Sequence, residues 1–158
     1  MKRLIPFSVV RFLLLSTITL DCLASTLPVT NEELILESRD IIHGIVMEVT
    51  SKWDQNHSLI YTYVKLEVLD VFKGEAGDQV VIQILGGSVD DTTFVVEGTS
   101  EVKEGMEVII YTGLHKNGNL GIYSGDRGVY MVNNGVVEEL NMTLDQFKNL
   151  VDELIKQK

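Results

Sequence analysis

The stretch IYTYVKLEVLDVFKG, residues Ile60 to Gly74, decides the fold of this chain. As far as Val68 its side chains alternate between an apolar set and a set rich in Tyr, Lys and Glu, and this period of two predicts a β-strand. Asp70 then falls on the apolar face, so we expect a one-residue bulge at Leu69 or Asp70. A long strand with a bulge near its middle is typical of a sheet that curls into a barrel.

A helix and a partner strand are predicted before this stretch. Thr30 and Glu33 have the spacing of a capping box at the start of a helix from Asn31 to about Ser38. The side chains of the segment Asp40–Trp53 also alternate between two faces, which predicts a strand. Because the residues 54–58 between the two strands are polar and favour turns, the strands should form an antiparallel hairpin.

Shorter strands and a second helix are predicted after the hairpin. The strands are expected at Gln79–Leu85, Thr92–Val96, Glu107–Thr112, Leu120–Tyr123, Tyr130–Val132 and Val136–Val137. The segment 107–112 is apolar on both faces and should therefore be central in the sheet. Asn-Gly pairs at 117–118 and 134–135 predict hairpin turns. Thr143 and Gln146 form a second capping box, in front of an amphipathic helix that must pack on the sheet.

These elements predict a mainly β fold. The expected architecture is an OB-like five-stranded Greek-key barrel with extra C-terminal hairpin strands, a short N-terminal helix and a C-terminal amphipathic helix. The 158-residue chain shows no internal repeat and no low-complexity linker. After removal of a leader, it should therefore be a single domain that buries a core without disulfides.

The N-terminus has the pattern of a secretory signal peptide. The basic residues Lys2, Arg3 and Arg11 precede the apolar run Phe12–Leu20, which is too short for a comfortable membrane span, and small residues follow at Ala24 and Ser25. We expect cleavage near Ala24, which gives a signal peptide at 1–24 and one domain at 25–158, secreted or periplasmic and without a stable membrane span.

A lipoprotein anchor is the less favoured route of export. Such a site needs a small residue just before the cysteine, whereas Asp21 precedes Cys22. Cleavage near Ala24 leaves no cysteine, which excludes thiol catalysis and thiolate metal sites. An exported domain of this size without disulfides is typical of a bacterial envelope.

The charge of residues 25–158 excludes one class of partner. Removing residues 1–24 takes away three basic residues and Asp21, which leaves 10 basic and 22 acidic residues and a net charge of −12. A surface this acidic repels phosphates, so nucleic acid is not an expected partner. The favoured role of this charge is to keep an exported domain in solution, and attraction of a dedicated basic partner is the alternative.

No motif for catalysis or for a cofactor is present. The three histidines, His43, His57 and His115, lack paired metal-ligand spacing, and a structural or surface role is favoured for each. Carboxylates that could bind calcium are found in loops, but they follow no calcium-loop pattern: Asp90, Asp91, Glu97, Glu101 and Asp126. No nucleophile elbow, Walker loop or dinucleotide loop occurs. We therefore expect no enzyme, no cofactor and no metal site.

Five residues are the candidate binding residues. Trp53, Tyr61 and Tyr63 cluster around the first hairpin, where they could contact a partner protein or stack on a sugar. Cross-strand aromatic pairing that only stiffens the hairpin is the favoured alternative. Gly86 and Gly87 end a predicted strand and would let a backbone approach a ligand or another chain, although glycines commonly do no more than end a strand.

The residues from Asp40 to Thr112 resemble a known family. The pattern consists of DIIHGIVMEV, IYTYVKLEVLDVFKG, VVIQILGG and EGMEVIIYT, and its marker residues are Trp53, Tyr61, Thr62, Lys73, Gly74, Gly86, Gly87 and Gly105. It is similar to a group of uncharacterised exported bacterial OB-fold domains whose barrel is like that of tissue inhibitors of metalloproteinases. Those inhibitors chelate zinc through an N-terminal cysteine, which residues 25–158 lack. The resemblance therefore implies the architecture and leaves inhibition unsupported.

The sequence thus predicts a non-enzymatic exported module that binds a protein partner. A peptidase is one class of partner that the resemblance suggests. The contact surface would be the loops at one barrel end together with the hairpin aromatics. Two alternatives stay open, namely a module that binds carbohydrate or cell wall through the same aromatics, and a hydrolase with an unrecognised site.

Overall fold

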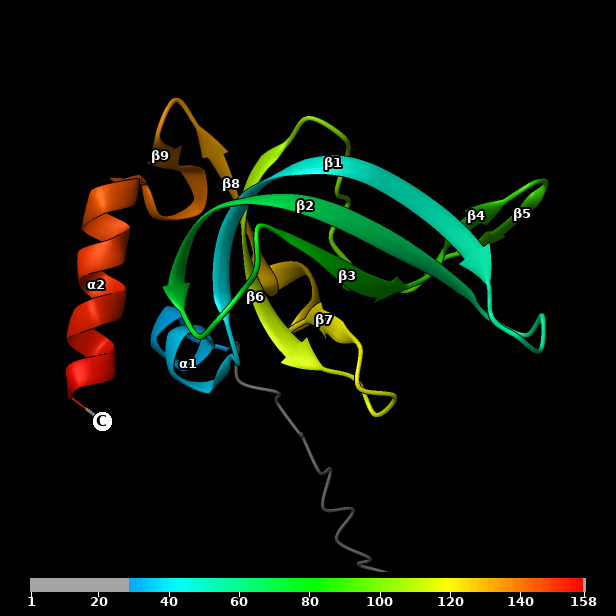
Figure 1. Cartoon of the computed structure of the whole chain (residues 1–158), viewed down its shortest axis with the longest axis horizontal. Helices are drawn as coiled ribbons and strands as arrows, with labels where there is room; N and C mark the ends of the chain where they lie inside the picture. The colour runs from blue at the N-terminus through cyan, green and yellow to red at the C-terminus, as the bar shows by residue number, and fades with distance from the viewer. Residues whose placement is uncertain (1–28, 158) are drawn as a thin grey trace, which may run out of the picture.

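The computed structural model describes residues 29–157, so the predicted signal peptide at 1–24 lies outside the described part. Figure 1 shows the elements in chain order. The helices are α1 (Asn31–Glu37) and α2 (Leu144–Lys156), with short 3-10 turns η1 (Gly125–Gly128) and η2 (Glu138–Leu140). The strands are β1 (Ile41–Trp53), β2 (Ile60–Lys73), β3 (Gln79–Leu85), β4 (Gly87–Val89), β5 (Thr92–Phe94), β6 (Glu107–Leu114), β7 (Leu120–Ile122), β8 (Val129–Asn133), β9 (Val136–Val137) and β10 (Met142–Thr143).

Most of the strands form one antiparallel sheet. Its order is β10-β9-β8-β6-β1-β2-β3, and β7 pairs with β6 beside this path. Strands make up 47% of the described residues, which confirms the mainly β prediction together with its two helices. The hydrogen-bonded ladders end at β3 and do not close into a barrel, although β3 lies beside β7.

The hairpin of β1 and β2 carries the predicted bulge. His43 pairs with Asp70 and Gly44 pairs with Val68, so Leu69 has no partner on β1. Two similar shifts leave Phe72 of β2 and Met47 of β1 unpaired. Such bulges increase the local twist, and the paired strands curve together as Figure 1 shows.

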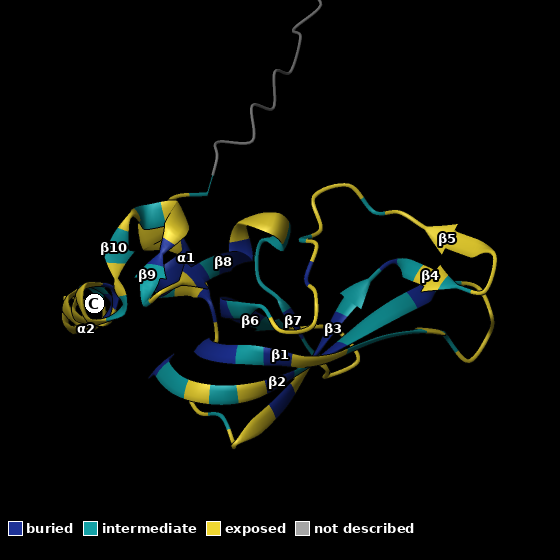
Figure 2. Ribbon diagram, turned by 90° about the horizontal axis from the view of Figure 1, so that it is seen from above, coloured by how far each residue is buried: buried dark blue, intermediate teal, exposed yellow. Residues whose placement is uncertain are grey.

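Two hydrophobic cores lie on opposite faces of the sheet, and β6 separates them. Ile109 and Tyr111 point into the core under the helices, whereas Val108 and Ile110 point into the core enclosed by the curved strands. This arrangement explains why the segment 107–112 is apolar on both faces, as predicted for a central strand. The two ends of the molecule differ accordingly. Figure 2 shows both helices at one end and the mostly exposed β4–β5 ribbon at the other.

The helix α2 begins at the predicted capping box. The Thr143 backbone N–H donates to Gln146 Oε1 at 2.9 Å, and the Gln146 N–H donates to Thr143 Oγ1 at 3.3 Å. Phe147 and Val151 are fully buried against the sheet, while Ile155 at the end of the predicted stripe is exposed. The helix is therefore held by its first three turns rather than by its last one.

One predicted strand has a different place in the sheet order. A strand was predicted at Thr92–Val96; in the structure it spans Thr92–Phe94 and pairs only with Gly87–Val89, in a separate two-stranded ribbon. Gly86 and Gly87 both have positive φ angles, 105° and 132°, which turn the chain out of β3 and straight into β4. Across residues 29–157, no helix has the length and apolar character that a membrane crossing requires.

Candidate functional site

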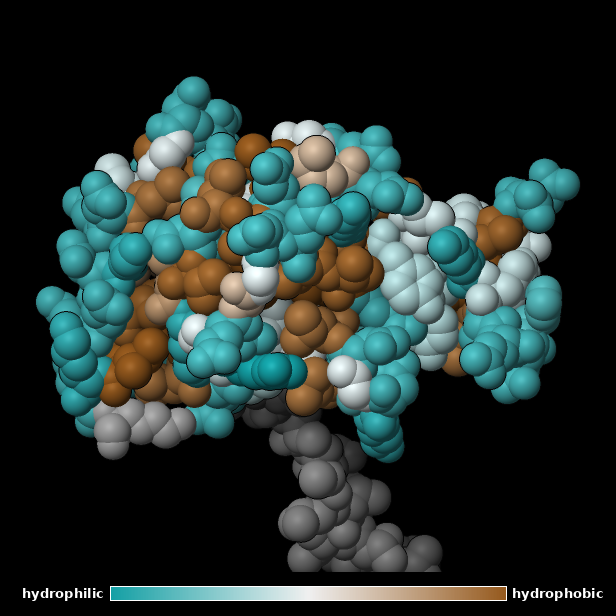
Figure 3. Space-filling model, in the orientation of Figure 1, coloured by the Kyte–Doolittle hydropathy of each residue, from teal (hydrophilic) through white to brown (hydrophobic). Residues whose placement is uncertain are grey.

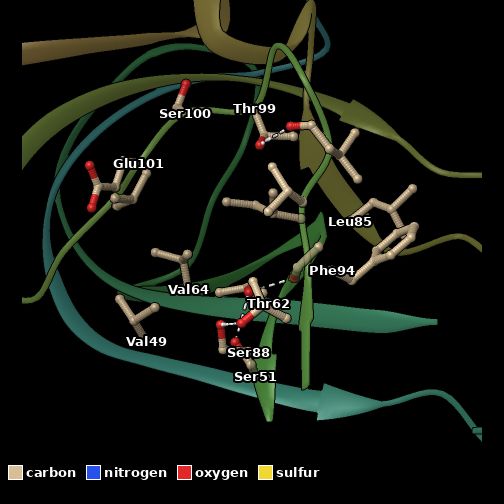
Figure 4. A pocket seen from close by; sticks show the side chains of 17 residues that line it. Val49, Ser51, Thr62, Val64, Leu85, Ser88, Phe94, Thr99, Ser100 and Glu101 are labelled. Atoms are coloured by element: carbon tan, nitrogen blue, oxygen red, sulfur yellow. Dashed lines mark hydrogen bonds between the residues drawn. The ribbon is translucent and has the colours of Figure 1, made fainter. Parts of the chain in front are cut away.

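A cleft of about 480 Å³ opens at the end of the molecule that carries the β4–β5 ribbon. We call it the strand-end cleft. It lies between the adjoining parts of β1, β2 and β3 and the covering segment 86–102. Figure 4 shows Val49 and Val64 on one side of it and Leu85 with Phe94 on another. Its volume is in the range of about 300–1,000 Å³ that is typical of ligand sites.

One wall of the strand-end cleft is a chain of hydroxyl groups. Thr62 Oγ1 donates to the Gly86 carbonyl at 2.7 Å and lies 2.9 Å from Ser51 Oγ. Because the single hydroxyl proton of Thr62 is donated to the Gly86 carbonyl, the Ser51 hydroxyl must donate its own proton to Thr62 Oγ1. These two residues face each other across the hairpin ladder, and both side chains point to the interior side of the strands.

The two predicted glycines shape the rim of this cleft. A side chain on Gly86 would meet the Phe94 carbonyl, and one on Gly87 would meet the hydroxyls of Ser51 and Thr62. At both glycines, the atoms in close contact with the backbone therefore belong to this same chain and not to a ligand or a second chain. These close contacts let the ribbon fold back over the strand ends.

The covering segment is held by backbone hydrogen bonds at Gly98 and just past its end at Gly105, whereas most of the part before Gly98 is exposed. The Asp126 N–H donates to the Gly98 carbonyl at 2.7 Å, and the Gly105 N–H donates to the Val46 carbonyl at 2.8 Å. Val102 is buried in the core, whereas Val95 is 78% exposed and Phe94 is 36% exposed. The cleft thus has an apolar rim that solvent can reach.

The three predicted aromatic residues lie outside the strand-end cleft. The Trp53 ring stacks on His57 of its own hairpin loop, with 6.0 Å between ring centroids and an interplanar angle of 23°. Tyr61 and Tyr63 are half-buried on β2, and the Tyr63 hydroxyl accepts a 3.3 Å hydrogen bond from Gln83 Nε2. The structure therefore separates the five predicted residues into two groups.

The loop that presents Trp53 is tied down by a carboxylate. Asp54 Oδ1 accepts hydrogen bonds from the Ser58 N–H at 2.6 Å and from the Leu59 N–H at 3.0 Å. These backbone donors lower the pKa of Asp54, since they favour its charged form. Trp53 and His57 are thus held at a fixed hairpin tip.

The histidines lie apart from one another. His43 is buried, its Nε2 lies 2.8 Å from Glu107 Oε1, and its ring stacks on Phe72 with 5.9 Å between centroids. His115 Nε2 lies 3.0 Å from the Gln83 carbonyl oxygen. Within the described residues, no group of three or more His, Cys, Asp or Glu side chains is arranged to hold a metal ion.

Sequence reasoning missed the hydroxyl wall and the exposed apolar rim. Thr62 did carry a signal, because it is a polar residue within the apolar set of an alternating strand. Ser51 and Phe94 carried none, since their importance depends on the hairpin register and on the pairing of β5 with β4.

Comparison with known proteins assigns no family to this chain. No protein-family model matches the chain, and no curated protein matches its sequence. The function must therefore be inferred from the geometry of the cleft.

Proposed function

We propose that this chain is a non-enzymatic exported module that binds a segment of a partner protein in the strand-end cleft. The observation that carries the proposal is an open cleft with an apolar floor, a hydroxyl wall and an exposed apolar rim at Phe94 and Val95. Exposed apolar groups at the rim of a concave site are typical of interaction surfaces. The core of such a surface supplies most of the binding energy.

The composition of the cleft supports binding rather than catalysis. Among the described residues that line it, Glu101 is the only one with an ionisable side chain, and none is a histidine, lysine or cysteine. The hydroxyls of Ser51 and Thr62 bond to each other and to a carbonyl, not to a base. A nucleophilic hydroxyl needs an oriented base within hydrogen-bond distance.

We further propose that the sheet is an OB-like barrel with a seam between β3 and β7. Neighbouring strands then follow the order β1-β2-β3-β7-β6, as expected for a five-stranded barrel of this type. Side chains join the seam, because Gln83 Oε1 accepts hydrogen bonds from Asn117 at 3.1 Å and from Asn119 at 2.9 Å. The resemblance to exported OB-fold domains agrees with this order.

A carbohydrate module is the second candidate. A shallow depression on the outer face of the strands is lined by Glu48, Thr50, Lys52, Tyr63, Lys65 and Val81. A tyrosine ring beside charged and hydroxyl groups is a common arrangement for holding a sugar. A Tyr63→Ala variant separates the candidates, since it should abolish saccharide binding in calorimetry and leave cleft binding unchanged.

The test of the main proposal is selection from a random peptide library followed by variant analysis. Selected peptides should shift amide NMR signals of residues 86–102. The double variant Phe94→Ser, Val95→Ser should weaken their binding at least about tenfold, or about 1.4 kcal/mol. Leu114→Ser is the matched control, because Leu114 is also exposed but lies away from the cleft. Binding that survives the double variant, or shifts confined to Tyr61 and Tyr63, would overturn the proposal.

A further inference from the structure

The segment that covers the strand-end cleft is strongly acidic. The covering segment and the three residues that follow it, residues 86–105, carry five acidic residues and a single basic one, Lys103: the acidic residues are Asp90, Asp91, Glu97, Glu101 and Glu104. All five are exposed. Lys103 Nζ lies 3.0 Å from Glu101 Oε1, so the only internal cation already has a partner. The chain that covers the cleft therefore carries an excess of negative charge, and one of its carboxylates, Glu101, lines the cleft itself.

Most of these carboxylates are not neutralised by the rest of the protein. Across residues 29–157, Asp90, Asp91 and Glu97 form no ion pair, and Glu104 Oε1 accepts only a backbone hydrogen bond, from Val49 at 3.2 Å. Like charges so close together repel one another and gain from a cation. An occupant with positive charge would relieve this repulsion.

An independent observation concerns the hydroxyl protons inside the cleft. Thr62 donates to the Gly86 carbonyl, Thr99 donates to the Val96 carbonyl at 2.8 Å, and Ser51 donates to Thr62. Each hydroxyl has one proton, so what these groups still offer an occupant is lone pairs. The carboxylate of Glu101, which also lines the cleft, is likewise an acceptor. These three hydroxyls and Glu101 thus favour N–H donors on the occupant. Ser100 Oγ, which also lines the cleft and has no partner among the described residues, can donate as well as accept.

We infer that the strand-end cleft binds an extended segment of a partner protein in which lysine or arginine alternates with apolar residues; this rests on the proposed function. An extended chain directs successive side chains to opposite sides. One set then reaches the apolar floor at Val49, Val64 and Ile84, and the other faces the acidic covering segment, which places Glu101 in the lining. Backbone N–H groups of the segment would donate to the hydroxyl wall.

The test uses three N-acetylated, C-amidated octapeptides that alternate valine with lysine, glutamate or serine. Each is titrated into the chain while amide signals of residues 86–102 are followed by NMR. We expect the dissociation constant of the valine-lysine peptide, measured from these shifts, to be at least about tenfold lower than those of the other two peptides. Its affinity should fall as sodium chloride is raised, because the attraction is between exposed charges.

Charge variants assign the effect to the covering segment. The double variant Glu97→Gln, Glu101→Gln should weaken binding of the valine-lysine peptide roughly fivefold, as expected for two exposed charge contacts. The control is Glu32→Gln, Glu153→Gln, which removes the same charge from exposed positions on α1 and α2 and should change affinity less than twofold.

The outcomes separate this inference from the function on which it rests. Equal binding of the valine-lysine and valine-glutamate peptides in the cleft would overturn the inference and leave protein binding intact. Equal loss in both double variants would also overturn it, since the charge would then act through the whole molecule. If no alternating peptide binds, the inference is wrong, and the peptides selected from the random library decide the proposed function by themselves.

Discussion

Thr112 and Asp40 form a reciprocal, fully enclosed pair that joins the start of β1 to β6. Thr112 Oγ1 donates to Asp40 Oδ2 at 2.8 Å and accepts from the Asp40 N–H at 3.1 Å. The Thr112 N–H donates to the Asp40 carbonyl at 2.8 Å, so the backbone ladder continues through the pair. Asp40 is 3% exposed and Thr112 is 0% exposed, and a buried carboxylate depends on such donors.

Thr112→Val should therefore destabilise the fold more than its small change in shape suggests. The variant leaves the Asp40 carboxylate and N–H without this partner, which should lower the free energy of unfolding by about 1–3 kcal/mol. Thr112→Ser is the matched control, because it keeps the hydroxyl and loses one methyl group, at a cost of about 1 kcal/mol. Urea titrations measure both. A loss in Thr112→Val no larger than that in Thr112→Ser would contradict this prediction, since the hydroxyl would then contribute no more than one methyl group.

Lys73 holds the C-terminal end of α1. Its Nζ donates to the carbonyl groups of Ile35 at 2.8 Å, Leu36 at 2.9 Å and Ser38 at 2.5 Å. The last carbonyls of a helix lack partners within it, and a cation there offsets the helix dipole. Lys73→Met should lower the free energy of unfolding by about 2 kcal/mol.

The control for Lys73 lies on the same strand. Lys65 is half-buried on β2 and forms no ion pair with any described residue, so Lys65→Met should change stability by at most about 0.5 kcal/mol. Hydrogen exchange should show faster opening of α1 in Lys73→Met alone. Exchange of α1 that is unchanged in this variant would contradict the assigned role.

Alanine substitutions at Gly87 and Gly118 would distinguish the cost of backbone strain from the cost of a steric clash. Both glycines have positive φ angles, 132° and 83°, but a side chain on Gly118 would meet nothing, whereas one on Gly87 would meet the hydroxyls of Ser51 and Thr62. Gly118→Ala should cost about 1–2 kcal/mol from the backbone alone. Gly87→Ala should cost about 1–3 kcal/mol more from overpacking. Thermal unfolding of the two variants measures the difference. Equal melting temperatures would contradict the packing of the ribbon on the hydroxyl wall.

The long strands, the bulge and the helix caps could be predicted because their signals are local. Alternation over β1 and β2 needs no knowledge of partners, and the break at Asp70 reveals the unpaired Leu69. A capping box is likewise confined to four residues. The apolar faces of β6 required only the general rule that a strand buried on both sides is central.

The strand-end cleft could not be predicted because it depends on register and on backbone conformation. Ser51 meets Thr62 only because Trp53 pairs with Ile60, and a loop of six residues does not fix that register. The β4–β5 ribbon depends on the positive φ angles of Gly86 and Gly87, which direct the chain back over the strand ends. Its polar sequence gives little indication of burial or of a site.

Asp70 and Lys148 link the bulged part of β2 to α2, and their contribution should depend on pH. Lys148 Nζ donates to Asp70 Oδ2 at 2.7 Å. This bond holds the pKa of Asp70 below its ordinary value and raises the pKa of Lys148. The Asp70 contribution is therefore complete above about pH 4 and is lost as the pH falls through the lowered pKa. The Lys148 contribution is complete below about pH 10 and is lost as the pH rises through the raised pKa.

A double-mutant cycle measures this link. Both side chains are more than two-fifths exposed, so the coupling free energy between Asp70→Asn and Lys148→Met should be at most about 1 kcal/mol at pH 7. It should decrease as the pH falls through the lowered pKa of Asp70 and also in high salt, because a protonated or screened carboxylate no longer attracts the ammonium group. Lys148 Nζ also lies 5.8 Å from the centroid of the Phe72 ring, and that contact should persist at pH 2. A coupling that does not change between pH 7 and acidic pH would contradict an attraction between the charges of Asp70 and Lys148.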